Sequence, residues 1–174
     1  MSDGLKIWGK SAGVEIPPAK TVKYLGLYLD TKLNWRVHIA KKRKQLDLRY
    51  KELYWLLGRT SPLSINNKLL LYKTVIAPIW TYGLELWGCA SKSNIAIIQT
   101  FQSKLLRAIV NSPWYVTNAM IHSDLGISTV QDVIHDRSNK HRTKLHSHPN
   151  PLLQPLSREN NIPRRLKRRW PADL

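Results

Sequence analysis

The sequence is poor in cysteine and has no long apolar run. Its one cysteine, Cys89, excludes an internal disulfide framework and is typical of a protein from a reducing compartment. No apolar stretch approaches the roughly 20 residues of a membrane span, and the first residues show no signal-peptide core. We therefore expect an intracellular protein, cytoplasmic or nuclear, without a membrane partner.

Acidic residues are also scarce. The 174 residues include 11 Asp and Glu against 28 Lys and Arg, which gives a formal net charge of +17. Solubility does not require so large an excess, and such a charge attracts polyanions. The composition therefore favours a nucleic-acid partner.

The motifs of common enzymes are missing. The acids are scattered, without the close pair or trio of carboxylates that holds two metal ions about 4 Å apart. There is no phosphate-binding glycine loop, nucleophile elbow or zinc-protease motif. Histidines cluster at His135, His141, His146 and His148, but their spacing fits no zinc pattern, so chance clustering is preferred to the alternative of a metal site. We predict no catalytic residue and no metal site.

The length suits one medium domain with tails, and the hydrophobic pattern predicts a mainly α fold. Residues 1–33 alternate strand-like runs with turn residues, which predicts a small antiparallel β meander. A meander this small needs cover from a helix or a larger sheet. Residues 34–147 have helical periodicity, and residues 148–174 are a proline-rich basic segment that we expect to be a disordered tail.

Residues 34–57 form the first predicted helix, which Gly58 ends. One face carries Trp35, Ile39, Leu46 and further apolar residues, and the other is strongly basic. A charged face is often only solvated, but four consecutive cations at 41–44 repel one another unless phosphates lie nearby. Both interpretations stay open.

A buried helix is predicted from Ser64, a suitable N-cap, to Trp87. Its apolar face includes Leu69, Tyr72, Ile76 and Leu86, and Pro78 lies within it. Because proline lacks a backbone donor, we expect a kink or a break there, into helices 65–77 and 79–87. On pattern alone, this segment is simply a core helix.

Three further helices are expected. Ser93 is the predicted N-cap of a helix that ends near residue 110, with Ile98 and Phe101 on its buried stripe. Asn118 is the predicted cap of a short helix that stops at Gly126. Thr129 and Asp132 form an imperfect capping box for a last helix to about residue 145.

Aromatic residues are interleaved with the cations, which suits nucleic acid because phosphates need Lys or Arg and unstacked bases need flat apolar faces. We assign Trp80 and Trp87, in the buried helix, to packing. The better candidates for contact are Tyr24, Trp114, Tyr115 and Trp170. The tail cations could serve binding or nuclear localisation.

Several motifs in order resemble the end of the palm and the thumb of reverse transcriptases from jockey-like non-LTR retrotransposons. Residues 22–30 (VKYLGLYLD), with Asn34-Trp35 and His38-Ile39, resemble the last part of the palm. The thumb-like segments follow at 71–78 (LYKTVIAP), 101–104 (FQSK), 111–116 (NSPWYV) and 122–127 (HSDLGI), and the match continues through 148–151 (HPNP) to 164–168 (RRLKR). The similarity runs from about Val22 to the end of the chain.

The resemblance implies a fragment. The family's polymerase copies RNA into DNA with two Mg²⁺ ions held by aspartates, including an Asp-Asp pair upstream of the Tyr-Leu-Gly segment, and nothing here matches that pair. We therefore expect no cofactor in this chain and no polymerisation by it alone, unless the Asp-Asp coding sequence lies immediately upstream. The implied partners are RNA, DNA and their hybrid, together with the fingers and palm.

By the same resemblance, Tyr24, Leu25 and Gly26 correspond to the primer grip, although Gly26 could be an ordinary strand glycine. The implied thumb would grip the template–primer through phosphate contacts. The alternative is a decayed retroelement product or a basic protein-interaction module. The predicted nucleic-acid contacts, besides the primer grip, are Lys23, Arg36, Lys41, Lys42, Arg43, Lys68, Lys73, Lys104, Arg107, Trp114, Tyr115, Arg164, Arg165, Lys167, Arg168 and Arg169.

Overall fold

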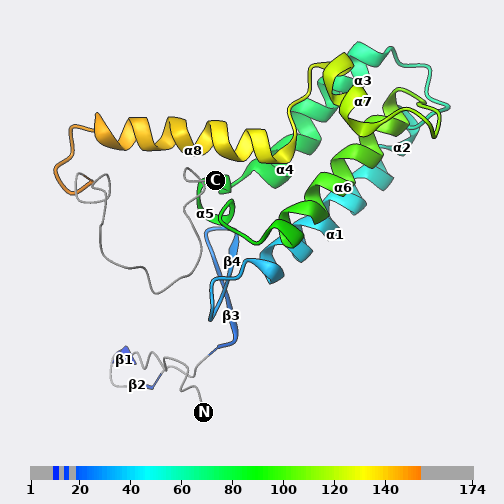
Figure 1. Cartoon of the computed structure of the whole chain (residues 1–174). Helices are drawn as coiled ribbons and strands as arrows, with labels where there is room; N and C mark the ends of the chain where they lie inside the picture. The colour runs from blue at the N-terminus through cyan, green and yellow to red at the C-terminus, as the bar shows by residue number, and fades with distance from the viewer. Residues whose placement is uncertain (1–9, 12–13, 16–18, 154–174) are drawn as a thin grey trace.

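The computed structural model describes residues 10–11, 14–15 and 19–153, and within them the chain is mainly helical, as predicted (Figure 1). Short antiparallel strands come first and helices follow, with the change between Asp30 and Arg36. The elements are β1 (Lys10–Ser11), β2 (Val14–Glu15), β3 (Thr21–Tyr24), β4 (Leu27–Asp30), α1 (Arg36–Glu52), α2 (Tyr54–Leu57), α3 (Ile65–Leu71), η1 (Tyr72–Ile76), α4 (Ala77–Thr81), α5 (Leu84–Trp87), α6 (Lys92–Ile109), α7 (Asn118–Leu125) and α8 (Val130–His146).

The strands form two separate hairpins rather than one meander. β1 pairs only with β2, and β3 only with β4, in the described residues. Residues 22–29, part of the predicted meander, turn back at Leu25 and Gly26, both with positive φ (45° and 79°). This two-residue turn matches the natural twist of a hairpin. Residues 1–9, 12–13 and 16–18 of the predicted meander lie outside the described residues.

Helices α1 and α6 form the centre of the bundle and run in the same direction. The Asn94 amide donates to the carbonyl of Asn34 near the start of both helices, and further along the Tyr50 ring meets the Phe101 ring edge-on at 6.3 Å. The predicted inner faces are buried, with Ile39 and Leu46 at 0% exposure. The first predicted helix is interrupted at Leu53, between α1 and α2, and Gly58 ends it as expected.

Of the kink or break expected at Pro78, the break does not occur. The chain stays helical from Ile65 to Thr81 because η1 is a turn of π-helix, in which Ala77 N–H donates to the carbonyl of Tyr72, five residues back. This wider turn accommodates the proline ring in place of a break. Pro78 is the second residue of α4, so its missing donor falls within the continuous helix directly after the π-helical turn.

The chain breaks instead at Tyr82 and Gly83. Tyr82 is extended, and Gly83 has φ 66° and ψ 22°, the left-handed conformation that favours glycine. The break shifts the helical phase, so that Leu84 and Trp87 are buried, whereas Leu86, predicted to be inward, is 52% exposed. Trp80 and Trp87 pack in the core, as predicted.

The predicted caps of the later helices were wrong by one or two residues, except for the last. The Ser91 hydroxyl, not that of Ser93, accepts from Asn94 N–H at the start of α6. Thr117, not Asn118, caps α7. Thr129 and Asp132 form a complete capping box at α8, with both reciprocal hydrogen bonds. Gly126 ends α7 with φ 59°.

Helix α8 extends away from the bundle, on the side opposite to α2, α3 and α7 (Figure 1). It packs mainly through its first half, where Val130 and Ile134 are buried and Arg137 donates to the carbonyl of Thr81. None of the helices in the described part of the chain combines the length and apolar character needed to cross a membrane. Most of the predicted tail, including Trp170, lies outside the described residues.

Candidate nucleic-acid interface

The β3–β4 hairpin docks on the helices through its tip. The Tyr82 hydroxyl donates to the carbonyl of Leu25 at 2.7 Å. A Cβ on Gly26 would lie 3.3 Å from the Tyr82 ring, and one on Gly83 would lie 2.7 Å from Leu27, which is buried. Both glycines therefore permit close contacts that a side chain would obstruct. For Gly26, this favours close approach over an ordinary strand glycine.

Strand β4 rests on a buried histidine close to the tip of the hairpin. Tyr28 N–H donates to Nδ1 of His38 at 3.3 Å, and the imidazole lies among the rings of Trp35, Trp87 and Tyr28. Burial, and to a lesser extent the charge of Lys42, lowers the pKa of His38 to about 4. Its Nε2 is buried without a hydrogen-bond partner in the described residues. The ring is therefore neutral near pH 7 and is a point of acid sensitivity.

Three predicted lysines gather beside two tyrosine rings. Lys23 and Lys41 place Nζ 5.9 and 6.0 Å from the centre of the Tyr28 ring, and Lys42 Nζ lies 5.2 Å from that of Tyr82. These are cation–π distances. Burial lowers the pKa of Lys42. We call Lys23, Tyr28, Lys41, Lys42 and Tyr82 the hairpin platform.

The primer-grip candidates lie next to the platform, at the tip of the hairpin. Tyr24 is 61% exposed and Leu25 is 71% exposed, although Leu25 is apolar and has a left-handed backbone that leucine rarely adopts. Strained, exposed residues held by a tertiary hydrogen bond cluster at functional sites. Tyr82 could not be assigned to this region from the sequence, because 57 residues separate it from Leu25.

The other predicted cations of the described residues do not join the platform. Arg43 pairs with Asp47 and stacks on Phe101 at 4.9 Å, so it contributes to helix packing. Lys68 is buried and donates to the carbonyl of Gly58 at 2.9 Å, which leaves it unavailable to phosphate. The prediction of Lys68 as a phosphate contact is therefore wrong. Four further predicted contacts lie on the helices: Arg36, Lys73 and Lys104 are exposed, and Arg107 donates to the loop after α6.

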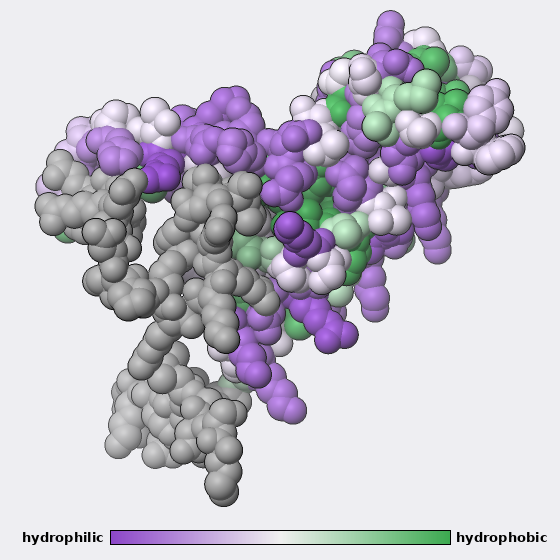
Figure 2. Space-filling model, in the orientation of Figure 1, coloured by the Kyte–Doolittle hydropathy of each residue, from purple (hydrophilic) through white to green (hydrophobic). Residues whose placement is uncertain are grey.

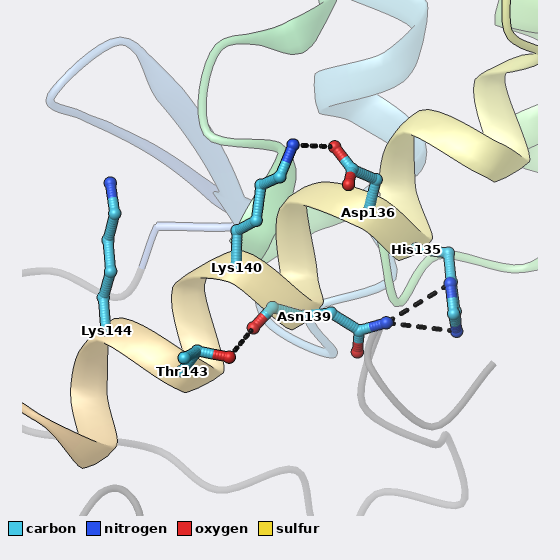
Figure 3. Close-up of a pocket in the computed structure, with 6 residues that line it drawn as sticks. All are labelled: His135, Asp136, Asn139, Lys140, Thr143 and Lys144. Carbon is cyan, nitrogen blue, oxygen red and sulfur yellow. Dashed lines mark hydrogen bonds and ion pairs between the residues drawn. The ribbon is translucent and has the colours of Figure 1, made fainter.

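An open depression of about 490 Å³ lies on α8 (Figure 3). All six lining residues come from that helix, and Lys140 pairs with Asp136 across it. His135 lies at one end and interacts with the Asn139 amide. No group of three metal-binding side chains occurs in the described residues. The depression is therefore one polar face of α8, and its lining includes no functional group from another described element.

Hydrophilic side chains cover α8, whereas hydrophobic residues appear over α3 and α7 at the opposite end (Figure 2). The predicted contacts Trp114 and Tyr115 belong to the loop between α6 and α7, and are 91% and 68% exposed. The cations predicted at Arg164, Arg165, Lys167, Arg168 and Arg169 lie outside the described residues.

Comparison with known proteins gives relatives along nearly the whole chain. It is 41% identical, over 92% of its length, to the probable RNA-directed DNA polymerase from transposon X-element of Drosophila melanogaster. It is 35% identical, over 90%, to the probable RNA-directed DNA polymerase from transposon BS of the same fly. It is also 35% identical, over 87%, to the RNA-directed DNA polymerase from mobile element jockey of Drosophila funebris.

The chain spans only 17–18% of the length of these curated relatives. No model of a protein family matches it. No solved structure matches it either.

Proposed function

Since the chain is a homologue of part of the RNA-directed DNA polymerases of jockey-like transposons, we propose that it is the thumb and primer-grip region of such an enzyme, and that it grips the RNA–DNA template–primer. The observation that carries the proposal is the hairpin platform. It combines three lysines with two tyrosine rings, and the strained hairpin tip lies next to it.

The chemistry of the platform suits a nucleic-acid backbone. Lysines bind phosphates without regard to sequence, as a polymerase requires. The tyrosine faces beneath the ammonium groups hold them in position, and the exposed ring of Tyr24 offers a flat surface for a sugar or base. Docking on Tyr82 fixes the tip relative to the helices, which is needed to position a primer end.

Nucleotide transfer and template–primer binding need different residues. Nucleotide transfer needs carboxylates that hold two Mg²⁺ ions, and we assign that task to the palm and fingers of the same enzyme, with which this region would assemble. The chain alone should bind the template–primer and polymerise nothing.

Replacing Lys23, Lys41 and Lys42 together by glutamine should weaken binding to a short RNA–DNA hybrid by roughly several hundredfold near 0.1 M salt. Each lost phosphate contact should also lower the slope of log affinity against log salt by about 1, so the slope should fall by about 3. The measurement is fluorescence anisotropy over a salt series.

A matched control removes three charges elsewhere. Lys51, Lys140 and Lys144 are exposed and are not platform residues, so their joint replacement by glutamine should leave most of the affinity. Equal losses in both triple variants would show a diffuse charge effect and refute the platform. Binding that ignores salt altogether would favour the alternative of a protein-interaction module.

A further inference from the structure

The loop between α6 and α7 presents two large aromatic rings to solvent. Trp114 is 91% exposed, the highest value among the exposed large hydrophobic residues of the described chain. Tyr115 is 68% exposed, and its ring meets that of Trp114 edge-on, with the centres 6.0 Å apart and the planes at 82°. We call residues 111–117 the aromatic loop.

The aromatic loop is held firmly. The Arg107 guanidinium donates to the carbonyls of Pro113 and Val116 and to Oδ1 of Asn118, at 2.6–2.9 Å. These acceptors lie on both sides of the aromatic pair. Ser112 N–H donates to the Arg107 carbonyl, and Thr117 caps α7. The two rings are thus exposed by a braced loop, and a preorganised aromatic surface loses little entropy on binding a partner.

The aromatic loop is separate from the hairpin platform. The start of α6 lies near the end of the hairpin, since Asn94 bonds to Asn34. The loop follows the other end of this 18-residue helix, which spans about 27 Å at 1.5 Å per residue. One nucleotide cannot contact both the hairpin platform and the aromatic loop. The loop therefore needs a separate ligand or a distant nucleotide of the same nucleic-acid strand.

Charge favours nucleic acid as that ligand. In the described contacts the Arg107 guanidinium bonds only to uncharged acceptors, so its charge is not cancelled by a carboxylate. Lys104, one helical turn before Arg107, is also exposed. Asp124 of α7 lines the small cavity of about 200 Å³ beside the loop. Bases in a duplex are stacked on each other, whereas those of a single strand are free to stack on a protein ring.

We propose that the aromatic loop is a second binding site, which takes one or two unpaired nucleotides of single-stranded RNA or DNA. A base stacks on Trp114, Tyr115 supports that ring from the side, and Lys104 and Arg107 attract the adjacent phosphates. Arg107 is also a positioning residue because it fixes the loop. The proposal does not depend on the hairpin platform.

Replacing Trp114 by alanine should weaken binding to a labelled eight-nucleotide oligouridine about tenfold, because base stacking on an aromatic ring is worth about that much. Affinity for a blunt RNA–DNA hybrid should stay unchanged. Trp55, 71% exposed on α2, provides the control: its replacement by alanine should leave both affinities as they are. An abasic strand of equal length should bind the native chain as weakly as oligouridine binds the Trp114→Ala variant.

Arg107→Lys separates positioning from charge. This variant keeps the positive charge but cannot make three hydrogen bonds to the loop. Oligouridine affinity should therefore fall severalfold while the salt slope stays constant. Unchanged oligouridine affinity in the Trp114→Ala variant would refute the nucleotide site and would favour a protein as the partner of the two rings. Equal losses of oligouridine and hybrid affinity in that variant would also refute the nucleotide site. If the platform lysine variant alone bound the hybrid as tightly as the native chain, the platform would be refuted and the aromatic-loop site would not.

Discussion

Replacing Gly83 by alanine should lower the free energy of unfolding by about 2–4 kcal/mol and detach the hairpin from the helices. A left-handed backbone costs a non-glycine residue about 1 kcal/mol or more. The added Cβ would also lie 2.7 Å from Cδ2 of Leu27, which is buried, and overpacking adds about 1–3 kcal/mol. Because Gly83 adjoins Tyr82, the strain falls on the contact that holds the hairpin tip.

Gly126 is the matched control. It has a similar positive φ, 59°, but a Cβ there would meet no atom within 4 Å. Gly126→Ala should therefore lose only the backbone cost of about 1 kcal/mol. Urea unfolding gives both values, and amide hydrogen exchange at β3 and β4 reports the hairpin. Equal losses at the two glycines would contradict the close contact of Gly83 with Leu27.

Acid should destabilise the protein through His38. The native state keeps this imidazole neutral down to about pH 4, whereas the unfolded state takes up a proton near pH 6.5. The unfolded state therefore binds more protons in between, and stability that is complete above pH 6.5 falls as the pH is lowered to about 4. The loss is on the order of 3 kcal/mol.

A His38→Phe variant, compared with the native chain by urea unfolding from pH 7 to pH 4, isolates this effect. The variant loses the acceptor for Tyr28 N–H, so it should be less stable at pH 7, but its stability should depend less on pH. Replacing the exposed His141 should leave the native pH dependence in place. If the His38 variant and the native chain lost stability in parallel, the buried neutral imidazole would be refuted.

Hydrophobic periodicity was enough to predict most helices, because burial of Ile39, Leu46, Ile98 and Phe101 depends on spacing within one element. The same spacing could not show that a π-helical turn would carry the chain past Pro78, because nothing local specifies the extra residue. The break at Gly83 was missed for a related reason. The room that a side chain at Gly83 would need is filled by Leu27, from a strand far away in the sequence.

The site divides in the same way. Composition and charge indicated the lysines, but tertiary contacts decide which of them can reach a phosphate. Lys42 lies over the Tyr82 ring, whereas Lys68 donates to the carbonyl of Gly58. The role of Arg107 could not be predicted for the same reason. Its hydrogen bonds to the carbonyls of the aromatic loop form only because the chain turns back after α6. Residue type and spacing therefore predicted a basic surface, and only the fold distinguished exposed cations from those that brace the structure.

The most direct test of the thumb and primer-grip assignment is the affinity of the native chain for an RNA–DNA hybrid, single-stranded RNA and duplex DNA, each measured by fluorescence anisotropy over a salt series. The account predicts tightest binding to the hybrid, with a steep decline as salt rises. Equal affinity for all three would reduce the protein to a basic patch. Absence of binding at low salt would contradict the nucleic-acid function itself.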